Sequence, residues 1–445
     1  MKTTNYTIIR VPKIFHQQMK ADLQRPHPYA AERVGFFSTS WVVKSPALKI
    51  ITVTGYLPLS DSDYIKDDSV GAKISSSAIR QVMERVISGG NGYLHVHLHD
   101  HYGTPTASIT DKKSLPDVAK SLLNADPTTA CGYFIGSKNS FFCNIYEHGQ
   151  NRPTEVDQMT VIGYPTKFIF PRGSSTGIIN KTVSRQSFLG SNSNFLFERV
   201  RIGIVGLGGG GSHIVQQLAH LGIKNFFLFD YDEIEFSNMN RLVGGEYLDV
   251  RNKLKKTKIA YRLIKRINPS ASVKLFNSKW QDHSSNLKSC DIVIGGVDSI
   301  EERYQLESAC RRSLIPLIDV GMDVHSLAEE NYAMSGQIIL SMPGMPCMNC
   351  FDFINEEKLT QEAKRYGAVG GRPQVIWPNG ILASTAVGLV VDLITGWSKL
   401  EDRRIYLGYD GVLGHMMDHP KGIYCEDICS HYLLDKTGDP ICTAL

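Results

Sequence analysis

The chain has 445 residues, with 48 Lys and Arg against 44 Asp and Glu, which gives a formal net charge of +4. At roughly 100–200 residues per domain, this length predicts two or three domains. Hydrophobic residues at 42% and charged residues at 21% exclude a wholly disordered or fibrous chain. The Lys and Arg residues are scattered along the sequence, so nucleic acid is not an expected partner.

The start of the chain has no apolar signal-peptide core, because residues 1–20 mix polar and single apolar side chains. The longest apolar stretch, 380–391, ends at Asp392 and is shorter than the ~20 residues that a membrane-spanning helix needs. We therefore expect a cytoplasmic protein with no membrane contact. Its nine cysteines are then expected to be reduced, as core residues, metal ligands or nucleophiles.

Residues 1–150 alternate short apolar runs with two helical patterns, which is typical of an α/β or α+β domain. The predicted strands are 49–54, 93–97 and 131–135, and the predicted helices are 76–87 and 115–124. The stretch 151–195 is rich in Asn, Ser, Thr, Gly and Pro, which indicates a connecting segment.

From Arg199 onward, strands and helices alternate regularly. The predicted strands are 200–205, 226–230, 273–276 and 292–295, and the predicted helices are 212–221 and 256–268. This alternation predicts a parallel, doubly wound sheet.

A glycine cluster lies between the first strand and the first helix of this second part, with glycines at 206, 208, 209, 210 and 211. Such glycines permit a tight turn and let phosphates approach backbone N–H groups at a helix N-terminus. Asp230 ends the next strand, where a carboxylate can hold ribose hydroxyls. A dinucleotide and ATP explain these features equally well.

The residues that follow favour a triphosphate. Asp230 and Asp232 form a carboxylate pair, and they are followed by Asn238 and Arg241. Lys256 opens the next helix, and Asp298 follows the strand 292–295. A triphosphate attacked at its α-phosphorus needs cations, which Arg241 and Lys256 supply, and a carboxylate for Mg²⁺, which Asp298 supplies.

With these motifs, the segment 180–430 resembles the ThiF-like superfamily, which includes ubiquitin-activating enzymes and sulfur-carrier adenylyltransferases. The matching runs are Gly-x-Gly-Gly-x-Gly, Asp-x-Asp-x-x-x-x-Ser-Asn-x-x-Arg, the residues Lys256 and Asp298, and the segments 316–321 and 343–350. The resemblance implies a Rossmann-like adenylation domain over 196–445 that uses ATP and Mg²⁺. In that reaction, a carboxylate at the C-terminus of a ubiquitin-like or sulfur-carrier protein attacks the α-phosphate and expels pyrophosphate.

The segment Ser184-Arg185-Gln186 looks like a family element whose arginine reaches the nucleotide site of a partner subunit. The resemblance thus implies a homodimer, with Arg185 on a helix in a linker over 156–195. The alternative is that Arg185 is an ordinary surface residue. A conjugating-enzyme-like protein is a further expected partner.

Two cysteine pairs, Cys347 with Cys350 and Cys425 with Cys429, suggest a structural Zn²⁺ site, since four thiolates satisfy tetrahedral coordination. The family usually has Cys-x-x-Cys in both places, whereas the second pair here is Cys-x-x-x-Cys. His431 or Cys442 is therefore a possible substitute ligand, and reduced free thiols are the alternative. Cys290 and Cys310 are expected in the core, and the crossover segment 351–379 lacks the thioester-forming cysteine of many relatives.

Alternate histidines from His95 to His101 are expected on one strand face, and Ser108 and Asp111 follow them. Two His and one Asp can hold a hydrolytic zinc ion. With the upstream Glu32, they resemble the JAB/JAMM metalloproteases. The resemblance makes residues 1–155 a smaller α/β domain of JAB/MPN type, with a Glu32 base, an oxyanion-stabilising Ser108 and the zinc ligands His95, His97 and Asp111.

The match to the JAB/JAMM motif is incomplete, because Leu98 stands where the motif has Pro and the interval to Ser108 is longer. The pair His97 and His99 is therefore an alternative ligand pair. A non-catalytic JAB-like module is the alternative for the whole domain.

Both resemblances concern the same substrate class, since one family cleaves after the C-terminal glycines of ubiquitin-like proteins and the other activates such termini. The leading hypothesis is an adenylyltransferase fused to a JAB-type peptidase that trims or deconjugates the same protein. The alternatives are a peptide- or sulfur-transfer adenylyltransferase with a JAB-like binding module, and a scaffold with both sites inactive.

Overall fold

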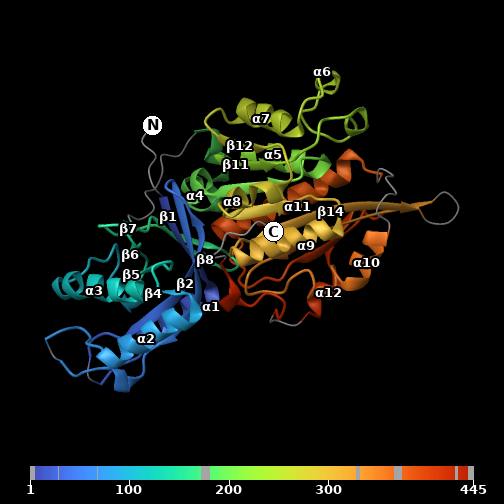
Figure 1. The fold of residues 1–445 in the computed structure, drawn as a ribbon. Coiled ribbons are helices and arrows are strands. Elements are labelled where there is room, and N and C mark those ends of the chain that lie inside the picture. The colour runs from blue at the N-terminus through green and yellow to red at the C-terminus, as the bar shows by residue number, and fades with distance from the viewer. Residues whose placement is uncertain are drawn as a thin grey trace. The chain divides into compact units, whose positions relative to one another are not determined.

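The structure, a computed structural model, describes residues 6–28, 30–67, 69–171, 181–326, 331–364, 373–425 and 429–438. The chain divides into two compact units. Unit 1 comprises Met1–Gly163, Lys167–Ser175 and Leu433–Thr443, and unit 2 comprises Tyr164–Thr166, Thr176–Tyr432 and Ala444–Leu445. The predicted boundary at 155/156 differs from this division, because two further strands of the unit 1 sheet follow it (Figure 1).

Unit 1 contains a nine-stranded sheet with the order β7-β6-β5-β4-β2-β3-β1-β8-β9. Its strands are β1 (Tyr6–Pro12), β2 (Val34–Lys44), β3 (Leu48–Pro58), β4 (Gly92–Leu98), β5 (Cys131–Gly136), β6 (Phe141–Tyr146), β7 (Thr154–Glu155), β8 (Gln158–Ile162) and β9 (Lys167–Ile169). Its helices are α1 (Lys13–Leu23), α2 (Ser76–Gly89) and α3 (Ile109–Ala125), with a 3-10 turn η1 (Asp61–Asp63) and, near the C-terminus, η5 (Leu434–Lys436).

Two apolar cores cover the two faces of this sheet. Met19 and Leu23 of α1 pack with one set of strand side chains, which includes Phe37 and Phe134. Apolar side chains of α2 and α3 pack with the set from the opposite face. Unit 1 is therefore a three-layer α/β/α arrangement in which β4, the histidine-bearing strand, is central.

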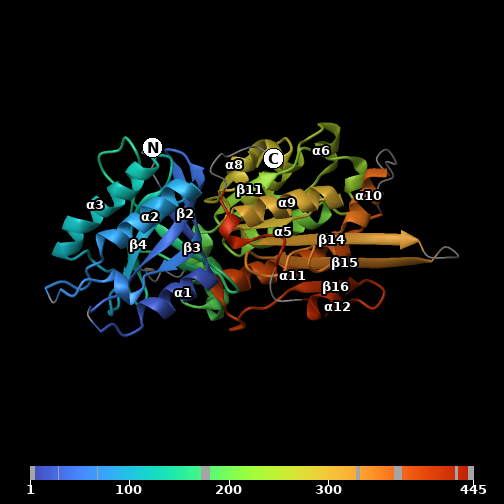
Figure 2. The ribbon, with the colours of Figure 1, turned by 60° about the horizontal axis from the view of Figure 1, so that its bottom comes forward.

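Unit 2 contains an eight-stranded sheet with the order β12-β11-β10-β13-β14-β15-β16-β17. The strands are β10 (Arg201–Val205), β11 (Asn225–Phe229), β12 (Ser272–Phe276), β13 (Ile292–Gly295), β14 (Leu317–Ser326), β15 (Tyr332–Ser341), β16 (Tyr406–Asp410) and β17 (His415–Asp418). The first five strands in spatial order are parallel, and the last three pairings are antiparallel. Figure 2 shows the long β14 and β15 running side by side.

The helices of unit 2 alternate with the parallel strands as the sequence predicts. They are α4 (Ser193–Arg199), α5 (Gly209–His220), α6 (Tyr247–Arg251), α7 (Lys256–Ile267), α8 (Ser284–Leu287), α9 (Ile300–Arg312), α10 (Glu356–Lys364), α11 (Ile376–Thr395) and α12 (Pro420–Ile423), with 3-10 segments η2 (Lys181–Leu189), η3 (Phe236–Asn238) and η4 (Trp280–His283). The chain order of the parallel strands across the sheet is third, second, first, fourth and fifth. This is the doubly wound order, and it confirms the Rossmann-like prediction.

The predicted elements of both units are present, and two helices start earlier than predicted. Helix α3 begins at Ile109 rather than at Leu115. The reason is a reciprocal cap, in which the Ser108 hydroxyl accepts from the Asp111 N–H and the Asp111 carboxylate accepts from the Ser108 N–H. Helix α5 begins at Gly209 rather than at Ser212, because the glycine cluster itself turns into the helix.

Helix α11 is longer than the apolar stretch in the sequence suggests. It has 20 residues and is the one helix in the described ranges that is long and apolar enough to cross a membrane. Two thirds of its apolar window (67%) is buried, and it packs on α5, β14 and β15. Its Asp392 is buried and accepts a hydrogen bond from the Tyr164 hydroxyl. The helix is thus part of the unit 2 core.

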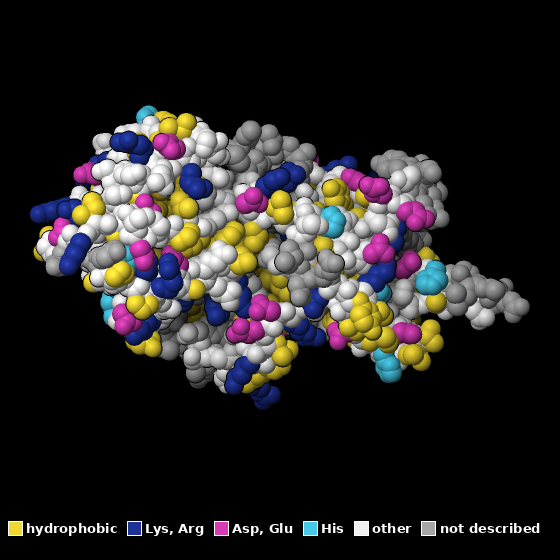
Figure 3. Space-filling model, turned by 90° about the horizontal axis from the view of Figure 1, so that it is seen from below, with side chains coloured by type: hydrophobic (Ala, Val, Ile, Leu, Met, Phe, Trp, Pro, Cys, Tyr) yellow, Lys and Arg dark blue, Asp and Glu magenta, His cyan; other side chains and the backbone are white. Residues whose placement is uncertain are grey.

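Charged side chains on the face shown in Figure 3 are mixed, with Lys and Arg interspersed among Asp and Glu. This distribution agrees with the near balance of the two signs in the sequence.

Candidate functional site

A pocket in unit 2 lies at the carboxyl ends of β10, β11 and β13 and is lined by the glycine cluster. In a doubly wound sheet, ligands bind at this edge, where the strand order reverses between the first and fourth strands. The pocket gathers the following predicted residues: Gly206, Gly208, Gly209, Gly211, Asp230, Asp232, Asn238, Arg241, Lys256 and Asp298.

The glycine loop fits a phosphate group because two of its positions exclude a side chain. Gly206 has a φ of +88°, which L-residues rarely adopt, and a Cβ there would lie 2.5 Å from the carbonyl oxygen of Gly296. A Cβ on Gly211 would lie 2.0 Å from the carbonyl oxygen of Gly206. The loop then enters α5 directly, so the first N–H groups of that helix face the pocket.

Asp230 is buried at the end of β11 and closes the loop beneath the pocket. One carboxylate oxygen accepts from the Leu207 N–H at 2.7 Å, and the other accepts from the Asp232 N–H at 2.8 Å. Burial raises the pKa of Asp230, and Lys256 and these two N–H donors counter only part of that effect. Asp230 therefore positions the glycine loop and also lines the pocket.

The two predicted cations are held in place by neighbouring side chains and backbone. Lys256 Nζ donates to Asp232 Oδ2 at 2.7 Å. Arg241 Nη1 donates to the carbonyl oxygen of Ser237 and to Asn240 Oδ1. Asn238 caps η3 by accepting from the Glu235 N–H at 3.0 Å. Cations, a glycine cradle and an exposed Asp298 in one pocket match the needs of a magnesium–triphosphate.

Arg185 lies apart from this pocket. It is an exposed residue of η2 and is not among the described residues that line the pocket. Its neighbour Gln186 donates to the carbonyl oxygen of Leu221 at 3.0 Å, which ties η2 to the end of α5.

Sequence reasoning missed several pocket residues that come from distant segments. Asn379 of α11 covers the glycine loop, where its amide nitrogen would lie 2.8 Å from a Cβ on Gly209. Arg303 of α9 is buried and forms an ion pair with the buried Asp319 of β14. Nothing in the local sequence around Asn379 indicates contact with a loop so far away in the chain. Arg303 follows Asp298 by five residues, but its partner Asp319 comes from a different strand, which the local sequence does not indicate.

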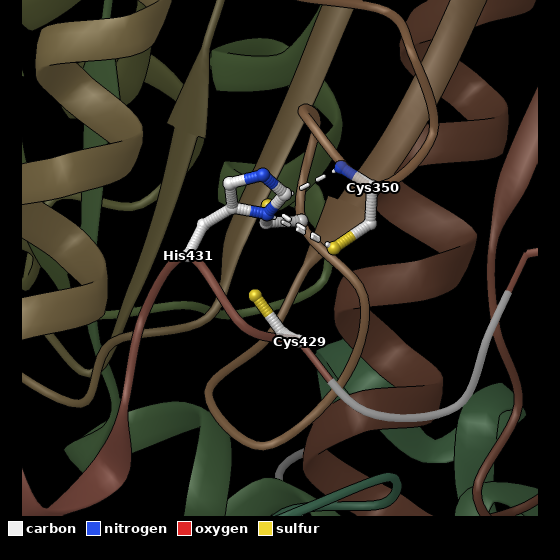
Figure 4. Close-up of side chains that lie close together, drawn as sticks. Cys350, Cys429 and His431 are labelled. Carbon is white, nitrogen blue, oxygen red and sulfur yellow. Dashed lines mark hydrogen bonds between the residues drawn. The ribbon is translucent and has the colours of Figure 1, made fainter.

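A second cluster in unit 2 consists of Cys347, Cys350, Cys429 and His431, whose ligand atoms all lie within 4.8 Å of one another. The sulfurs of Cys347 and Cys350 are 3.5 Å apart, and His431 Nδ1 lies 3.5 Å and 3.4 Å from them. Figure 4 shows the Cys350, Cys429 and His431 side chains converging on one point. Tetrahedral zinc, with ligand bonds of about 2.0–2.3 Å, places its ligands about 3.5 Å apart, so this set fits the ion.

The pKa values of Cys429 and Cys347 shift in opposite directions. The hydrogen bond from Cys347 lowers the pKa of the Cys429 thiol, and the nearby Arg311 guanidinium lowers it further. The same hydrogen bond, together with burial, raises the pKa of Cys347. Zinc binds the thiolate form, so binding of the ion would release the thiol protons.

Cys425 is not part of this cluster, which corrects the predicted ligand set. Its thiol donates to the carbonyl oxygen of Cys350 at 3.3 Å, and His431 takes the fourth position. Cys429 and His431 are separated by a single residue, so both can reach the sulfurs of Cys347 and Cys350. Cys442, the other proposed substitute, lies outside the described residues. Cys290 and Cys310 are buried in the core, as predicted.

In unit 1, the end of β4 brings His97 and His99 together with Glu32. The two Nε2 atoms are 3.3 Å apart, and His99 Nε2 lies 3.8 Å from Glu32 Oε1. His97 Nε2 lies 3.7 Å from Asp111 Oδ2. Burial, followed by the charge of Asp111, raises the pKa of Glu32.

His95, a predicted ligand, does not join this cluster. It is buried in the middle of β4, where its ring packs edge-on against Phe36 at 5.6 Å. Burial lowers the pKa of His95 to about 3. The alternative pair of His97 and His99 is the one that the geometry favours. Ser108 caps α3 rather than facing the histidines with a free hydroxyl, since its Oγ accepts from the Asp111 N–H at 3.1 Å.

The chain is similar to several curated proteins over part of its length. It is 28% identical over 236 residues to Ubiquitin-like modifier-activating enzyme 5 of Drosophila pseudoobscura pseudoobscura, covering 48% of this chain and 56% of that protein. It is 33% identical over 172 residues to the Gallus gallus protein of the same name, covering 35% and 41%. Over 117 residues it is 34% identical to the Molybdopterin-synthase adenylyltransferase of Haemophilus influenzae, covering 26% and 47%. The chain therefore spans about half the length of the curated relatives it matches.

Among solved structures, E. coli MccB with ATP covers 56% of this chain and 75% of its own, at 22% identity and a TM-score of 0.44. E. coli MccB with AMPCPP and the peptide MccA gives 20% identity and a TM-score of 0.45 over the same shares. The ThiF family matches residues 185–425 of this chain, which is more than half of it. The chain belongs to the ThiF family.

Proposed function

We propose that the unit 2 pocket adenylates the C-terminal carboxylate of a ubiquitin-like or sulfur-carrier protein at the expense of ATP. The observation that carries this proposal is the convergence of Arg241, Lys256 and Asp298 on the glycine loop in one pocket. A dinucleotide site has a pyrophosphate alone to neutralise and would not need this combination of charges.

In the proposed reaction, the carboxylate of the carrier attacks the α-phosphorus, and the bond to the pyrophosphate oxygen breaks. The products are an acyl adenylate and pyrophosphate. Arg241 and Lys256 neutralise the phosphate oxygens on which charge develops, and the glycine loop N–H groups hold the phosphates in line. Asp298 would hold Mg²⁺, which when bound adds further neutralisation.

The carrier class is supported by the relatives, which are named for activating a ubiquitin-like modifier and for adenylating molybdopterin synthase. The crossover segment 351–379 contains no cysteine, which favours release or direct transfer of the adenylate over thioester formation on this segment. A peptide- or sulfur-transfer adenylyltransferase is therefore the second version of this function. A conjugating-enzyme-like partner would be needed only if the enzyme forms a thioester with the carrier.

The proposed enzyme is a homodimer in which Arg185 enters the pocket of the partner subunit. The exposure of Arg185 and its distance from the pocket of its own chain support this arrangement. Zinc at Cys347, Cys350, Cys429 and His431 would be structural, since four protein ligands close the coordination shell. The protein is expected to act in the cytoplasm, where these thiols stay reduced.

A second activity, peptidase chemistry in unit 1, is favoured by one observation. Glu32, His97 and His99, with Asp111 beside them, place two imidazoles and two carboxylates in one cluster. We propose that His97, His99 and Asp111 hold zinc and that Glu32 takes the proton of the attacking water. Unit 1 would then be a JAB-type peptidase that trims or deconjugates the same carrier.

The adenylation proposal is tested with ATP labelled at the α-phosphate and a glycine-terminated ubiquitin-like protein. Labelled AMP should appear on the carrier, and a carrier without its terminal glycine should stay unlabelled. A folded chain that labels neither carrier would contradict the proposal, and stable release of a labelled short peptide would favour the peptide version.

The peptidase proposal is tested by cleavage of a carrier extended beyond its terminal glycine. Glu32→Ala should stop this cleavage and leave labelling of the mature carrier unchanged. Cleavage that survives Glu32→Ala would contradict the assigned base. Wild-type protein with bound zinc and no cleavage would leave unit 1 as a binding module.

A further inference from the structure

Helix α9 carries a row of buried charges that has no part in the proposed phosphate chemistry. Arg303, Glu307 and Arg311 are 6%, 0% and 2% exposed. They follow one another at intervals of four residues, so they lie on one face of the helix. Buried charges need partners, because an unpaired one costs a large desolvation free energy. The partners of this row come from the metal cluster at one end and from the unit 2 pocket at the other.

Arg311 holds the start of the loop 345–353 (the metal loop), which supplies two of the cluster cysteines. Its guanidinium donates to the carbonyl oxygens of Met345 at 2.8 Å and Pro346 at 2.6 Å. It also donates to Ser341 Oγ at 2.8 Å, at the end of β15. A guanidinium carries several donors in a rigid, planar arrangement, so it can fix two consecutive carbonyls at once. The backbone that leads into the first cysteine is therefore held by α9.

Glu307 holds the metal loop on the other side of that cysteine. Its carboxylate accepts from the N–H of Met348, the residue after Cys347, at 2.8 Å. The guanidinium of Arg311 also lies 5.6 Å from the ring centroid of Tyr432, which directly follows the histidine of the cluster. One face of α9 thus contacts both chain segments that supply the metal ligands.

Arg303 joins the same helix face to the unit 2 pocket. It lines the pocket and forms an ion pair with Asp319 of β14. Its guanidinium lies 5.9 Å from the ring centroid of Phe353, the last residue of the metal loop. The Phe353 N–H donates to the carbonyl oxygen of Met348 at 2.9 Å, so the loop turns back after Cys350. This turn brings the loop into contact with a pocket residue.

We propose that α9 couples the metal cluster to the unit 2 pocket. Zinc binding orders the metal loop, and the ordered loop fixes α9 through Glu307, Arg311 and Phe353. Arg303 and Asp298 line the pocket at the other end of this helix, so their positions toward a bound nucleotide depend on the metal. Glu307 and Arg311 are then positioning residues for the metal ligands. The inference rests on the proposed function, because it takes Mg²⁺–ATP as the ligand of the pocket.

Coupling of this kind is reciprocal and is measured from both sites of the full chain. In calorimetric titrations, the zinc-loaded chain should bind Mg²⁺–ATP at least about fivefold more tightly than the metal-depleted chain. In competition with a chromophoric zinc chelator, saturating Mg²⁺–ATP should raise the zinc affinity by the same factor. Equal Mg²⁺–ATP affinity of the two forms would overturn this inference and leave adenylation standing. A zinc-loaded chain that binds no Mg²⁺–ATP would overturn the proposed function as well.

Variants of two neighbouring arginines test the hold of α9 on the metal loop. Arg311→Gln replaces the guanidinium that binds the Met345 and Pro346 carbonyls, and it should lower the zinc affinity at least about tenfold. Arg312→Gln is the matched control and should keep the wild-type affinity, because Arg312 is exposed at the end of the same helix. Wild-type zinc affinity in Arg311→Gln would overturn the role of Arg311. If that variant fails to fold, the two measurements on the wild type still decide the question.

Phe353→Leu interrupts the contact with Arg303 and leaves the four ligands and the Arg311 hydrogen bonds in place. The effect of zinc on Mg²⁺–ATP affinity should fall to within about twofold, with the zinc affinity itself retained. A side chain that only packs the loop would lower stability and keep the coupling, so full coupling in Phe353→Leu would overturn the route through Arg303. Circular dichroism verifies that the metal-depleted chains are folded. Unfolding of the metal-depleted wild type would overturn the inference, since zinc would then hold the whole of unit 2.

Discussion

Substitution of Asp298 should reduce adenylation without changing the stability of the fold. Its side chain is exposed beside the pocket at the start of α9 and supports no core packing. Because Asp298 would hold Mg²⁺ on the phosphates, Asp298→Ala should reduce adenylation by about 10²–10³-fold. The melting temperature should stay within about a degree of the wild type, since surface substitutions change stability little.

Labelling of the carrier and a thermal melt of the same preparations check this prediction. Glu301→Ala, which removes an exposed carboxylate from the first turn of α9, should leave both measurements unchanged. Full adenylation by Asp298→Ala would contradict the assignment of Asp298 to Mg²⁺.

The glycine loop offers a matched pair of substitutions. A Cβ on Gly211 would lie 2.0 Å from the Gly206 carbonyl oxygen, whereas a Cβ on Gly208 has nothing within 4 Å. Gly211→Ala should therefore lower the free energy of unfolding by about 2 kcal/mol, as overpacked sites do. Gly208→Ala should leave it nearly unchanged, and chemical denaturation distinguishes the two. Equal stability of both variants would show that the loop is not packed as described.

At the scale of elements, the turn after β15 and the C-terminal turn together form the metal cluster. Because Cys350 is a member and Cys425 is not, Cys350→Ser should remove one zinc ion per chain and Cys425→Ser should remove none. Metal analysis of the purified variants gives the answer. Loss of zinc from Cys425→Ser, with retention in His431→Ala, would restore the ligand set predicted from the sequence.

The parallel strands of unit 2 could be predicted because each is a short apolar run bounded by clear helix patterns. The glycine loop, Lys256 and Asp298 could be placed because each directly follows a strand or opens a helix. Asn379 and Arg303 could not, since their roles depend on which distant elements pack over the loop. The cysteine motif predicted a four-ligand site but not which residues form it, because the fold places His431 and not Cys425 beside Cys347 and Cys350.

The histidine strand shows the same limit in unit 1. Period-two alternation predicted that His95, His97 and His99 share a face, and their rings do follow one another along β4. Which two of them meet Glu32 depends on how far the strand extends beyond the sheet core, and that cannot be obtained from periodicity. His95 is covered by Phe36, whereas the end of the strand is more open.

At the scale of the whole molecule, the proposal that Arg185 enters the pocket of the partner subunit predicts that two inactive variants restore activity when they are combined in one dimer. Arg185→Ala and Asp298→Ala should each be inactive as homodimers. In a mixed dimer, one of the two pockets combines an intact Asp298 with an intact Arg185 from the other subunit. Random assortment of equal amounts of the two chains should therefore restore about a quarter of the wild-type adenylation.

This recovery is measured after the two chains are refolded or co-expressed together. Either variant alone is the control. No recovery in verified mixed dimers would mean that Arg185 acts in its own subunit or not at all.

The central claim, that unit 2 charges a carboxylate with AMP, is tested most directly by exchange of labelled pyrophosphate into ATP. We predict exchange that depends on Mg²⁺ and on a carrier with an intact C-terminal glycine. A folded, zinc-loaded chain that binds ATP but shows no exchange with any glycine-terminated carrier or peptide would contradict the account.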